Sequence, residues 1–252
     1  MRKYEIAVLS KGSYARTVRI YAPKKATRAI IMHDGQNVFY DEDASYKKSW
    51  RALDALSAAK ITNTAIIGID SVNATRGDDY LPFATELEKY GMPVFGGKAD
   101  EYCDYIEQTV IPYLDKRFGF DAYGMLGSSA GALATLHFAS RQNAKLKAYG
   151  LFSTPLFICK DAYTEFFKTM ALDTSALYRI YVGGKEAVGE YGDPELIKIV
   201  PDLFVDDAFT LAKALRKAGA TDIKLALDNS GIHDEISWRA SEKQFFEDFS
   251  RL

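Results

Sequence analysis

Residues 122–138 read AYGMLGSSAGALATLHF, and within them residues 127–131 form the pattern G-x-S-x-G. The short apolar run before the pattern predicts a strand, and the alanine- and leucine-rich run after it predicts a helix. A serine between two such elements lies in a tight strand–turn–helix connection. Side chains at positions 127 and 131 are expected to collide with neighbouring backbone, which accounts for glycine at both. This stretch therefore predicts one strand-to-helix unit of an α/β fold.

Ser129 is the central serine of this pattern and the candidate nucleophile. The strained turn lifts its hydroxyl group out of the sheet edge, at the N-terminus of a helix whose dipole favours developing negative charge. The structural alternative is an ordinary helix N-cap with small neighbours for close helix–strand packing. The strand before the motif and the helix after it favour the nucleophile.

Outward from this unit, apolar runs and helical periodicity alternate along the chain. Two strands at the start of the chain are expected to pair antiparallel. No repeat or linker divides the chain, so a single domain is expected over residues 1–252. The further strands are expected at residues 4–10, 15–22, 28–32, 63–70, 147–153, 178–182 and 222–227, and the further helices at residues 50–59, 100–118, 204–217 and 234–249. The alternation predicts a mostly parallel sheet of about eight strands with helices on both faces. Ligands of such sheets bind beyond the carboxyl ends of the strands.

The composition of the chain indicates which kinds of binding partner and which cellular location to expect. The 252 residues include 32 basic and 34 acidic side chains, interspersed, so no nucleic-acid partner is expected. No apolar run approaches the roughly 20 residues that span a bilayer, and no signal-peptide pattern opens the chain, so a cytoplasmic protein without a membrane partner is expected. Cys103 and Cys159 lack metal or redox spacing, which favours free buried thiols over a disulfide.

A serine hydroxyl is a weak nucleophile until a neighbouring base takes its proton. The chain has three histidines. His233 follows the last expected strand and precedes the last helix, where the chain order of an α/β-hydrolase places its base. His33, at the end of the third strand, is a weaker rival. His137 lies about two turns along the helix after Ser129 and is expected to point away from the site.

A carboxylate is expected to orient the imidazole and stabilise its charged form. Glu186, in the segment GGKE, is the first carboxylate after the strand at residues 178–182. Its competitors are Asp193, Asp206 and Asp207. An exposed glutamate beside a lysine is otherwise only a solvated charge.

Two backbone N–H groups are expected to stabilise the oxyanion of a tetrahedral intermediate. One belongs to Ala130, directly after the nucleophile. The other belongs to Gln36, in the segment HDGQN that follows the third strand. Gly35 is expected to let the chain turn there without steric cost. The alternative is an ordinary Asp-Gly turn.

Together these segments resemble the putative-esterase family of α/β-hydrolases, which includes feruloyl and acetylxylan esterases, siderophore esterases, S-formylglutathione hydrolases and mycolyltransferases. The resemblance covers about residues 18–249 and rests on four segments: HDGQNVF at 33–39, GSSAGAL at 127–133, GGKE at 183–186 and G-x-H-x-E-x-x-W-R at 231–239. It implies an α/β-hydrolase fold with Ser129, His233, Gln36 and Ala130 in the roles given above. Ala132 departs from the glycine that many members have, and the stretch at 187–203 is longer than in many of them.

The expected activity is that of a serine carboxylesterase working through an acyl-enzyme, without metal or organic cofactor. The substrate is expected to be a small-molecule ester: an acylated carbohydrate, a feruloyl or acetyl ester, or a siderophore ester. Residues 80–95 and 191–201 are expected to shape its pocket. The alternatives are an acyltransferase, a binding protein with an incomplete triad and, more distantly, a metal-dependent hydrolase using His33, Asp34 and His233. The oligomeric state stays open.

Overall fold

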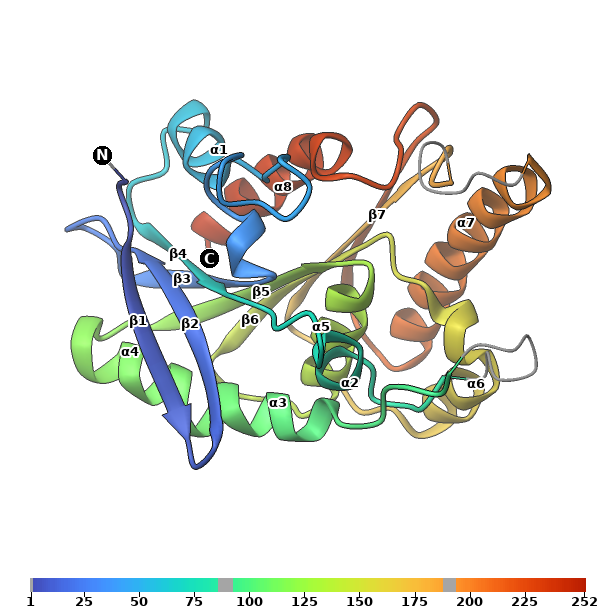
Figure 1. The fold of residues 1–252 in the computed structure, drawn as a ribbon, viewed down its shortest axis with the longest axis horizontal. Coiled ribbons are helices and arrows are strands. Elements are labelled where there is room, and N and C mark those ends of the chain that lie inside the picture. The colour runs from blue at the N-terminus through green and yellow to red at the C-terminus, as the bar shows by residue number, and fades with distance from the viewer. Residues whose placement is uncertain (1, 86–92, 188–193) are drawn as a thin grey trace.

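The computed structural model describes residues 2–85, 93–187 and 194–252, and within them eight strands form one sheet (Figure 1). In spatial order the strands are β1 (Glu5–Lys11), β2 (Tyr14–Tyr21), β4 (Thr64–Ile69), β3 (Arg28–His33), β5 (Ala122–Ser128), β6 (Leu146–Phe152), β7 (Leu177–Gly183) and β8 (Asp222–Asp228). β2 pairs antiparallel with β1 and β4, and every other neighbouring pair is parallel. The expected sheet, with its antiparallel start, is confirmed.

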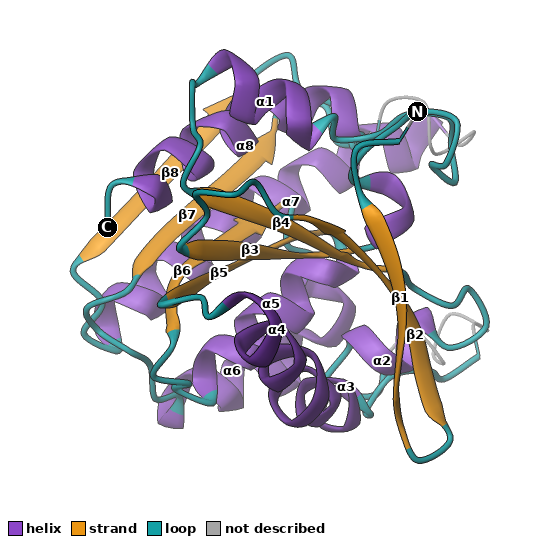
Figure 2. Ribbon diagram, turned by 90° about the vertical axis from the view of Figure 1, so that its left-hand side faces the viewer, coloured by secondary structure: helices purple, strands orange, loops and turns teal. Residues whose placement is uncertain are grey.

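Helices cover both faces of the twisted sheet (Figure 2). They are α1 (Ala52–Ala58), α2 (Arg76–Tyr80), α3 (Ala99–Tyr105), α4 (Ile111–Phe118), α5 (Ala130–Ser140), α6 (Lys160–Thr169), α7 (Pro194–Lys217) and α8 (Glu235–Ser250). A π-helical turn, Ile106–Val110, joins α3 to α4, so the two form the single helical segment expected at residues 100–118. Among the described residues, no helix is long and apolar enough to cross a membrane.

The two faces of the sheet bury separate hydrophobic clusters, because side chains alternate along a strand. In β3, Ala29 and Ile31 pack into the cluster that includes α3, α4, α5 and α7, whereas Ile30 and Met32 pack toward α1 and α8. All four are essentially inaccessible to solvent. Full burial of an isoleucine or methionine side chain contributes about 1.5–3 kcal/mol, so both faces anchor this central strand.

Three helices differ from the sequence-based expectation: α7 begins earlier than expected, and no helix was expected at α2 or α6. α7 begins at Pro194 rather than Phe204, so most of the expected loop at residues 191–201 is helical, while residues 191–193 lie outside the described residues. Proline fits the first turn of a helix, as Pro194 does, but inside a helix it removes a hydrogen bond, so Pro201 is an unusual residue within α7. The short helix α2 lies between residues 70 and 100, where no helix was expected.

Glu242 of α8 provides a test of packing on the α1 side. Its side chain is fully buried, neither carboxyl oxygen has a hydrogen-bond partner among the described residues, and burial raises its pKa well above the usual range. Because a buried polar group without a partner is destabilising, Glu242→Met should raise the free energy of unfolding by about 1–3 kcal/mol, measured by urea denaturation. A lower stability would instead show that the carboxyl group makes a stabilising contact.

Candidate active site

Ser129 occupies the turn between β5 and α5. Its backbone has φ 54° and ψ −129°, a left-handed conformation that is strained for a residue with a side chain. The turn is held because Ser129 N donates to Phe152 O at 2.9 Å. A Cβ atom on Gly127 would overlap the backbone carbonyl of Gly131, as the sequence predicts. On Gly131 it would instead meet the Cβ atom of His33, at 3.2 Å.

His233 and Glu186 form a direct pair. His233 Nδ1 lies 2.7 Å from Glu186 Oε2, and the carboxyl group is fully buried. The other carboxyl oxygen, Oε1, accepts hydrogen bonds from Gly183 N and Ser153 Oγ, each at 2.6 Å. Both oxygens therefore have partners, and the position of the imidazole is set by a carboxylate that is itself fixed in place.

Glycines allow the two loops that carry this pair to pack closely. A Cβ atom on Gly183 would lie 2.7 Å from the carbonyl carbon of Gly231, and one on Gly231 would overlap the hydroxyl of Tyr181. The loops are also joined by the backbone bond from Lys185 N to Gly231 O, at 2.9 Å. The glycines of the GGKE and G-x-H segments thus bring Glu186 within reach of the histidine.

Two aromatic rings enclose the His233 imidazole. The centroids of Phe204 and Trp238 lie 5.1 and 5.2 Å from its own, and Trp238 meets the imidazole edge-on. Trp238 Nε1 donates to Ser153 Oγ at 2.9 Å, and this hydroxyl donates in turn to Glu186. Ser153 is buried, with φ 48° at the end of β6. Trp238 belongs to the G-x-H-x-E-x-x-W-R segment, but neither its contact with the histidine nor that of Ser153 with Glu186 could be predicted from the sequence.

The backbone N–H groups of Gln36 and Ala130 each belong to the first turn of a helix, where no carbonyl of the same helix can accept from them. The Gln36 side chain is tied to Ser71 by two hydrogen bonds: Nε2 donates to Ser71 Oγ at 2.9 Å, and Oε1 accepts from Ser71 N at 3.1 Å. Neither amide is therefore bonded within its own helix.

Gly35 has a different role from the one the sequence suggested. The left-handed residue of this loop is Asp34, with φ 53°. A Cβ atom on Gly35 would lie 2.5 Å from the carbonyl carbon of Gly68 in β4. Glycine is therefore needed because the loop passes against the neighbouring strand, and the expectation that it eases the turn is corrected.

Ser129, His233 and Gln36 open into one cavity of about 900 Å³ at the carboxyl ends of the strands. The loop after β3 adds Tyr46, Lys48 and Trp50 to its lining, and the segment after β4 adds Ser71, Asn73 and Arg76. The described part of residues 80–95 does not line it, so that prediction is wrong there: Tyr80 and Leu81 are buried in the core. Residues 86–92 lie outside the described residues.

Comparison with known proteins identifies the family. Residues 13–241 match the model of a family described as "Putative esterase". The chain belongs to this esterase family. A search of curated proteins gives no significant match to this esterase.

Solved structures share the fold of the esterase over nearly its whole length. An IroE-like serine hydrolase from Shewanella oneidensis has a TM-score of 0.75 and 17% identity, covering 98% of this chain and 80% of that one. The siderophore hydrolase EstA from Aspergillus nidulans has a TM-score of 0.75 and 18% identity, covering 99% and 95%. A ferulic acid esterase has a TM-score of 0.66 and 12% identity, covering 99% of each chain. At these identities the likeness establishes the α/β-hydrolase fold.

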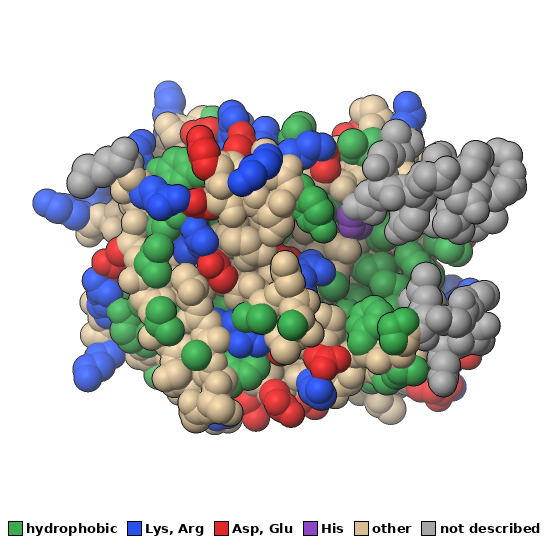
Figure 3. All heavy atoms as spheres, in the orientation of Figure 1, with side chains coloured by type: hydrophobic (Ala, Val, Ile, Leu, Met, Phe, Trp, Pro, Cys, Tyr) green, Lys and Arg blue, Asp and Glu red, His purple; other side chains and the backbone are tan. Residues whose placement is uncertain are grey.

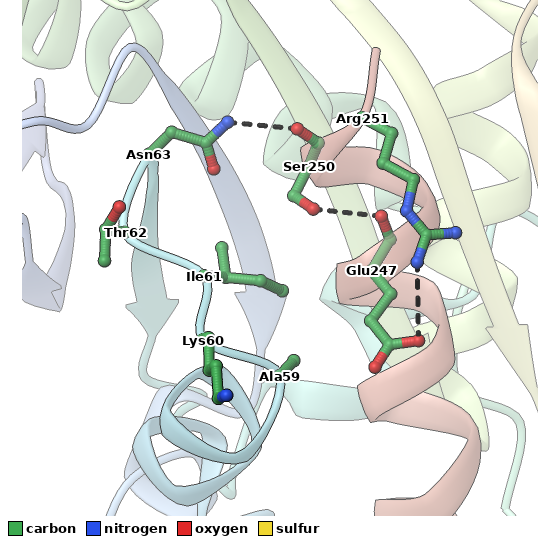
Figure 4. A pocket seen from close by; sticks show the side chains of 8 residues that line it. All are labelled: Ala59, Lys60, Ile61, Thr62, Asn63, Glu247, Ser250 and Arg251. Carbon is green, nitrogen blue, oxygen red and sulfur yellow. Dashed lines mark hydrogen bonds and ion pairs between the residues drawn. The ribbon is translucent and has the colours of Figure 1, made fainter.

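The esterase has a second, smaller hollow of about 360 Å³ at the opposite edge of the sheet (Figure 4). It lies where Asn63 precedes β4 and where α8 ends, and Asn63 Nδ2 donates to Ser250 O at 3.0 Å. None of the expected site residues lines it. Because ligands of parallel sheets bind at the carboxyl ends of the strands, the larger cavity is the candidate site.

Charges on the outside of the esterase are mixed. In Figure 3, Lys and Arg side chains alternate with Asp and Glu side chains over the visible face. A mixed surface creates little long-range field, so the pocket lining has more influence on substrate binding than the overall charge.

The other two histidines lie outside the cavity lining. His33 is buried with Nδ1 2.8 Å from the hydroxyl of Tyr102, and burial lowers its pKa to about 4. His137 Nε2 lies 2.9 Å from Asp100 Oδ1. In the part of the chain that the structure describes, no cluster of His, Cys, Asp or Glu is arranged to hold a metal ion, and Asp34 instead pairs with Arg76.

Three other carboxylates compete with Glu186 for the role of the acid. Asp193 is outside the described residues, and Asp206 is exposed on α7. Asp207 is buried, and its Oδ2 accepts from Phe157 N at 2.7 Å. Cys103 and Cys159 are both buried and no disulfide joins them, as expected.

The burial of Asp207 predicts that the stability of the esterase depends on pH. Burial raises the pKa of its carboxyl from 3.8 to about 7, so between these values the folded state keeps a proton that the unfolded state has lost. Raising the pH through this window should therefore lower the free energy of unfolding, by about 2–4 kcal/mol. Asp207→Asn should remove this dependence in urea denaturation at pH 5 and pH 8, whereas Asp206→Asn should keep it. An unchanged slope in Asp207→Asn would contradict the assignment.

Proposed function

We propose that this esterase is a serine carboxylesterase that works through an acyl-enzyme on Ser129. His233 Nε2 takes the proton of the Ser129 hydroxyl as the oxygen attacks the ester carbonyl, and then gives that proton to the departing alcohol. Water next loses a proton to His233 and attacks the acyl-enzyme, which releases the acid and restores the serine. The N–H groups of Gln36 and Ala130 stabilise the oxyanion formed in both halves.

The observation that carries this proposal is the hydrogen bond between His233 Nδ1 and the buried carboxylate of Glu186, at 2.7 Å. A proton held on Nδ1 leaves the lone pair of the neutral ring on Nε2, which is the form a general base needs. The strained backbone of Ser129, in the lining of the same cavity as His233, supports the serine as the partner of that base.

The proposed substrate is a small-molecule ester. Structural neighbours are named as siderophore hydrolases and a ferulic acid esterase, and a cavity of about 900 Å³ suits a ligand of that size. Feruloyl, acetyl, acylated-carbohydrate and siderophore esters are the candidates. The mixed polar lining favours an ester that carries several hydroxyl or carbonyl groups.

A fluorophosphonate probe tests the proposal directly. The wild type should label rapidly, with the phosphonyl group on Ser129 by peptide mass spectrometry, and Ser129→Ala should not label. A panel of feruloyl, acetyl, acetylated-xylan and trilactone siderophore esters then ranks substrates by kcat/KM. A wild type that neither labels nor hydrolyses any member would overturn the proposal in favour of a binding protein.

A further inference from the structure

One buried hydrogen bond joins the loop of the oxyanion donor Gln36 to the loop of His233. Asn37 Nδ2 donates to Glu235 Oε1 at 2.9 Å, between residues 198 positions apart in the sequence. The two residues are 7% and 6% exposed. Asn37 directly follows Gln36, and Glu235 stands two residues after His233, so this contact joins the chain beside both groups.

On one side of the bridge, every polar group of Asn37 is used. Its Oδ1 accepts from Ser45 N at 2.9 Å, its N donates to Asp34 O at 2.8 Å, and its O accepts from Trp50 N at 2.8 Å. A residue held in this way cannot rotate without breaking several bonds. Any displacement of Asn37 also moves the neighbouring Gln36 amide.

On the other side, Glu235 is the first residue of α8, a helix anchored on the sheet through Phe245, Phe246 and Phe249. The preceding residue, Asp234, caps the helix by accepting from Ser237 N at 2.9 Å. The carboxylate of Glu235 therefore sits on a rigid element, one step beyond the loop that carries His233.

We propose that Asn37 and Glu235 are positioning residues that hold the Gln36 amide and the His233 imidazole at one fixed separation across the cavity. This inference rests on the proposed function, in which both groups act on the same carbonyl. A shift of about 1 Å in such a group lowers the rate substantially, because oxyanion donors act only on the geometry of the transition state. The stability of the fold does not by itself explain a buried polar pair, because apolar residues of similar volume would stabilise the folded state equally well.

Exchanging the donor and the acceptor of the hydrogen bond between positions 37 and 235 tests the proposal. Asn37→Asp keeps the acceptor for Ser45 N but sets two carboxylates against each other, and should lower kcat about 10- to 100-fold with KM changed less than about threefold. Adding Glu235→Gln supplies an amide donor to the new carboxylate at position 37, so the double variant should recover kcat to within about threefold of wild type. A simple loss of folded protein would lower the active fraction, measured by fluorophosphonate titration, and leave the kcat per titrated site unchanged.

Glu242→Gln is the matched control: the same buried substitution, two turns along the same helix and outside the cavity lining, with an expected wild-type kcat. Asn37→Ser, which removes the bond without adding charge, should show the same kcat loss if Asn37→Asp does not fold. Wild-type kcat in the Asn37 variants, or no recovery in the double variant, would overturn the inference. Labelling of Ser129 in the wild type reports separately on the proposed function.

Discussion

Ser129→Ala is expected to lower kcat by roughly 10⁴- to 10⁶-fold, and His233→Ala by a similar factor. The reason is that a hydroxyl without its base, or a base without its hydroxyl, forms almost no acyl-enzyme. The double variant should be no slower than the single ones, because the two groups act as one unit. The rate that remains should be roughly 10³- to 10⁴-fold above that of the uncatalysed reaction in water, and should come from the oxyanion donors and from substrate binding. Steady-state kinetics on the best ester of the panel measures all three.

His137→Ala is the matched control for the histidine, because His137 contacts Asp100 of α3 and does not line the cavity. It should keep the wild-type kcat. A Ser129→Ala variant with more than about one tenth of wild-type kcat, after contamination is excluded by titration, would remove Ser129 from the mechanism. Additive losses in the double variant would separate the serine from the histidine.

The centre of the sheet could be predicted because five of its strands are buried on both faces: β3, β4, β5, β6 and β7. β3, which reads RAIIMH, is an almost wholly apolar run, and such runs leave few alternatives. α2 could not be predicted in the same way, because its five residues carry no helical period. Tertiary ion pairs hold it instead: Arg76 pairs with Asp34, and Asp79 with Arg16.

Some residues of the candidate site could be predicted from the sequence, and others only from the folded structure. Ser129 and His233 could be proposed from local motifs and chain order, and Glu186 from its place after a strand. Ser153 and the Asn37–Glu235 bridge could not, since each acts through residues that only the folded sheet brings near. Ser153, for example, meets Glu186 because β6 and β7 are neighbours in the sheet. Sequence patterns carry the groups that react, whereas the groups that position them depend on tertiary contacts.

Glu186→Gln is expected to lower kcat by roughly 10²- to 10⁴-fold with little change in KM. The reason is that it moves the proton of the neutral His233 ring from one nitrogen to the other and leaves the shape of the site unchanged. The amide oxygen of glutamine would accept from Gly183 N and Ser153 Oγ, as Oε1 of the carboxylate does now. Its NH₂ group would then face His233 Nδ1 and donate to it. That donation fixes the tautomer with the proton on Nε2, which cannot take the proton of the serine.

Asp206→Asn is the matched control, since it makes the same change from carboxylate to amide at an exposed position on α7, and it should keep the wild-type rate. Ser153→Ala removes one donor to Oε1 and leaves the Glu186–His233 bond intact, so its loss of kcat should be smaller than that of Glu186→Gln. A full rate in Glu186→Gln would mean that the serine and histidine work as a pair, with the buried carboxylate serving only to hold the loop. Because that outcome would leave fluorophosphonate labelling of Ser129 intact, it would overturn the role of Glu186 without removing the nucleophile.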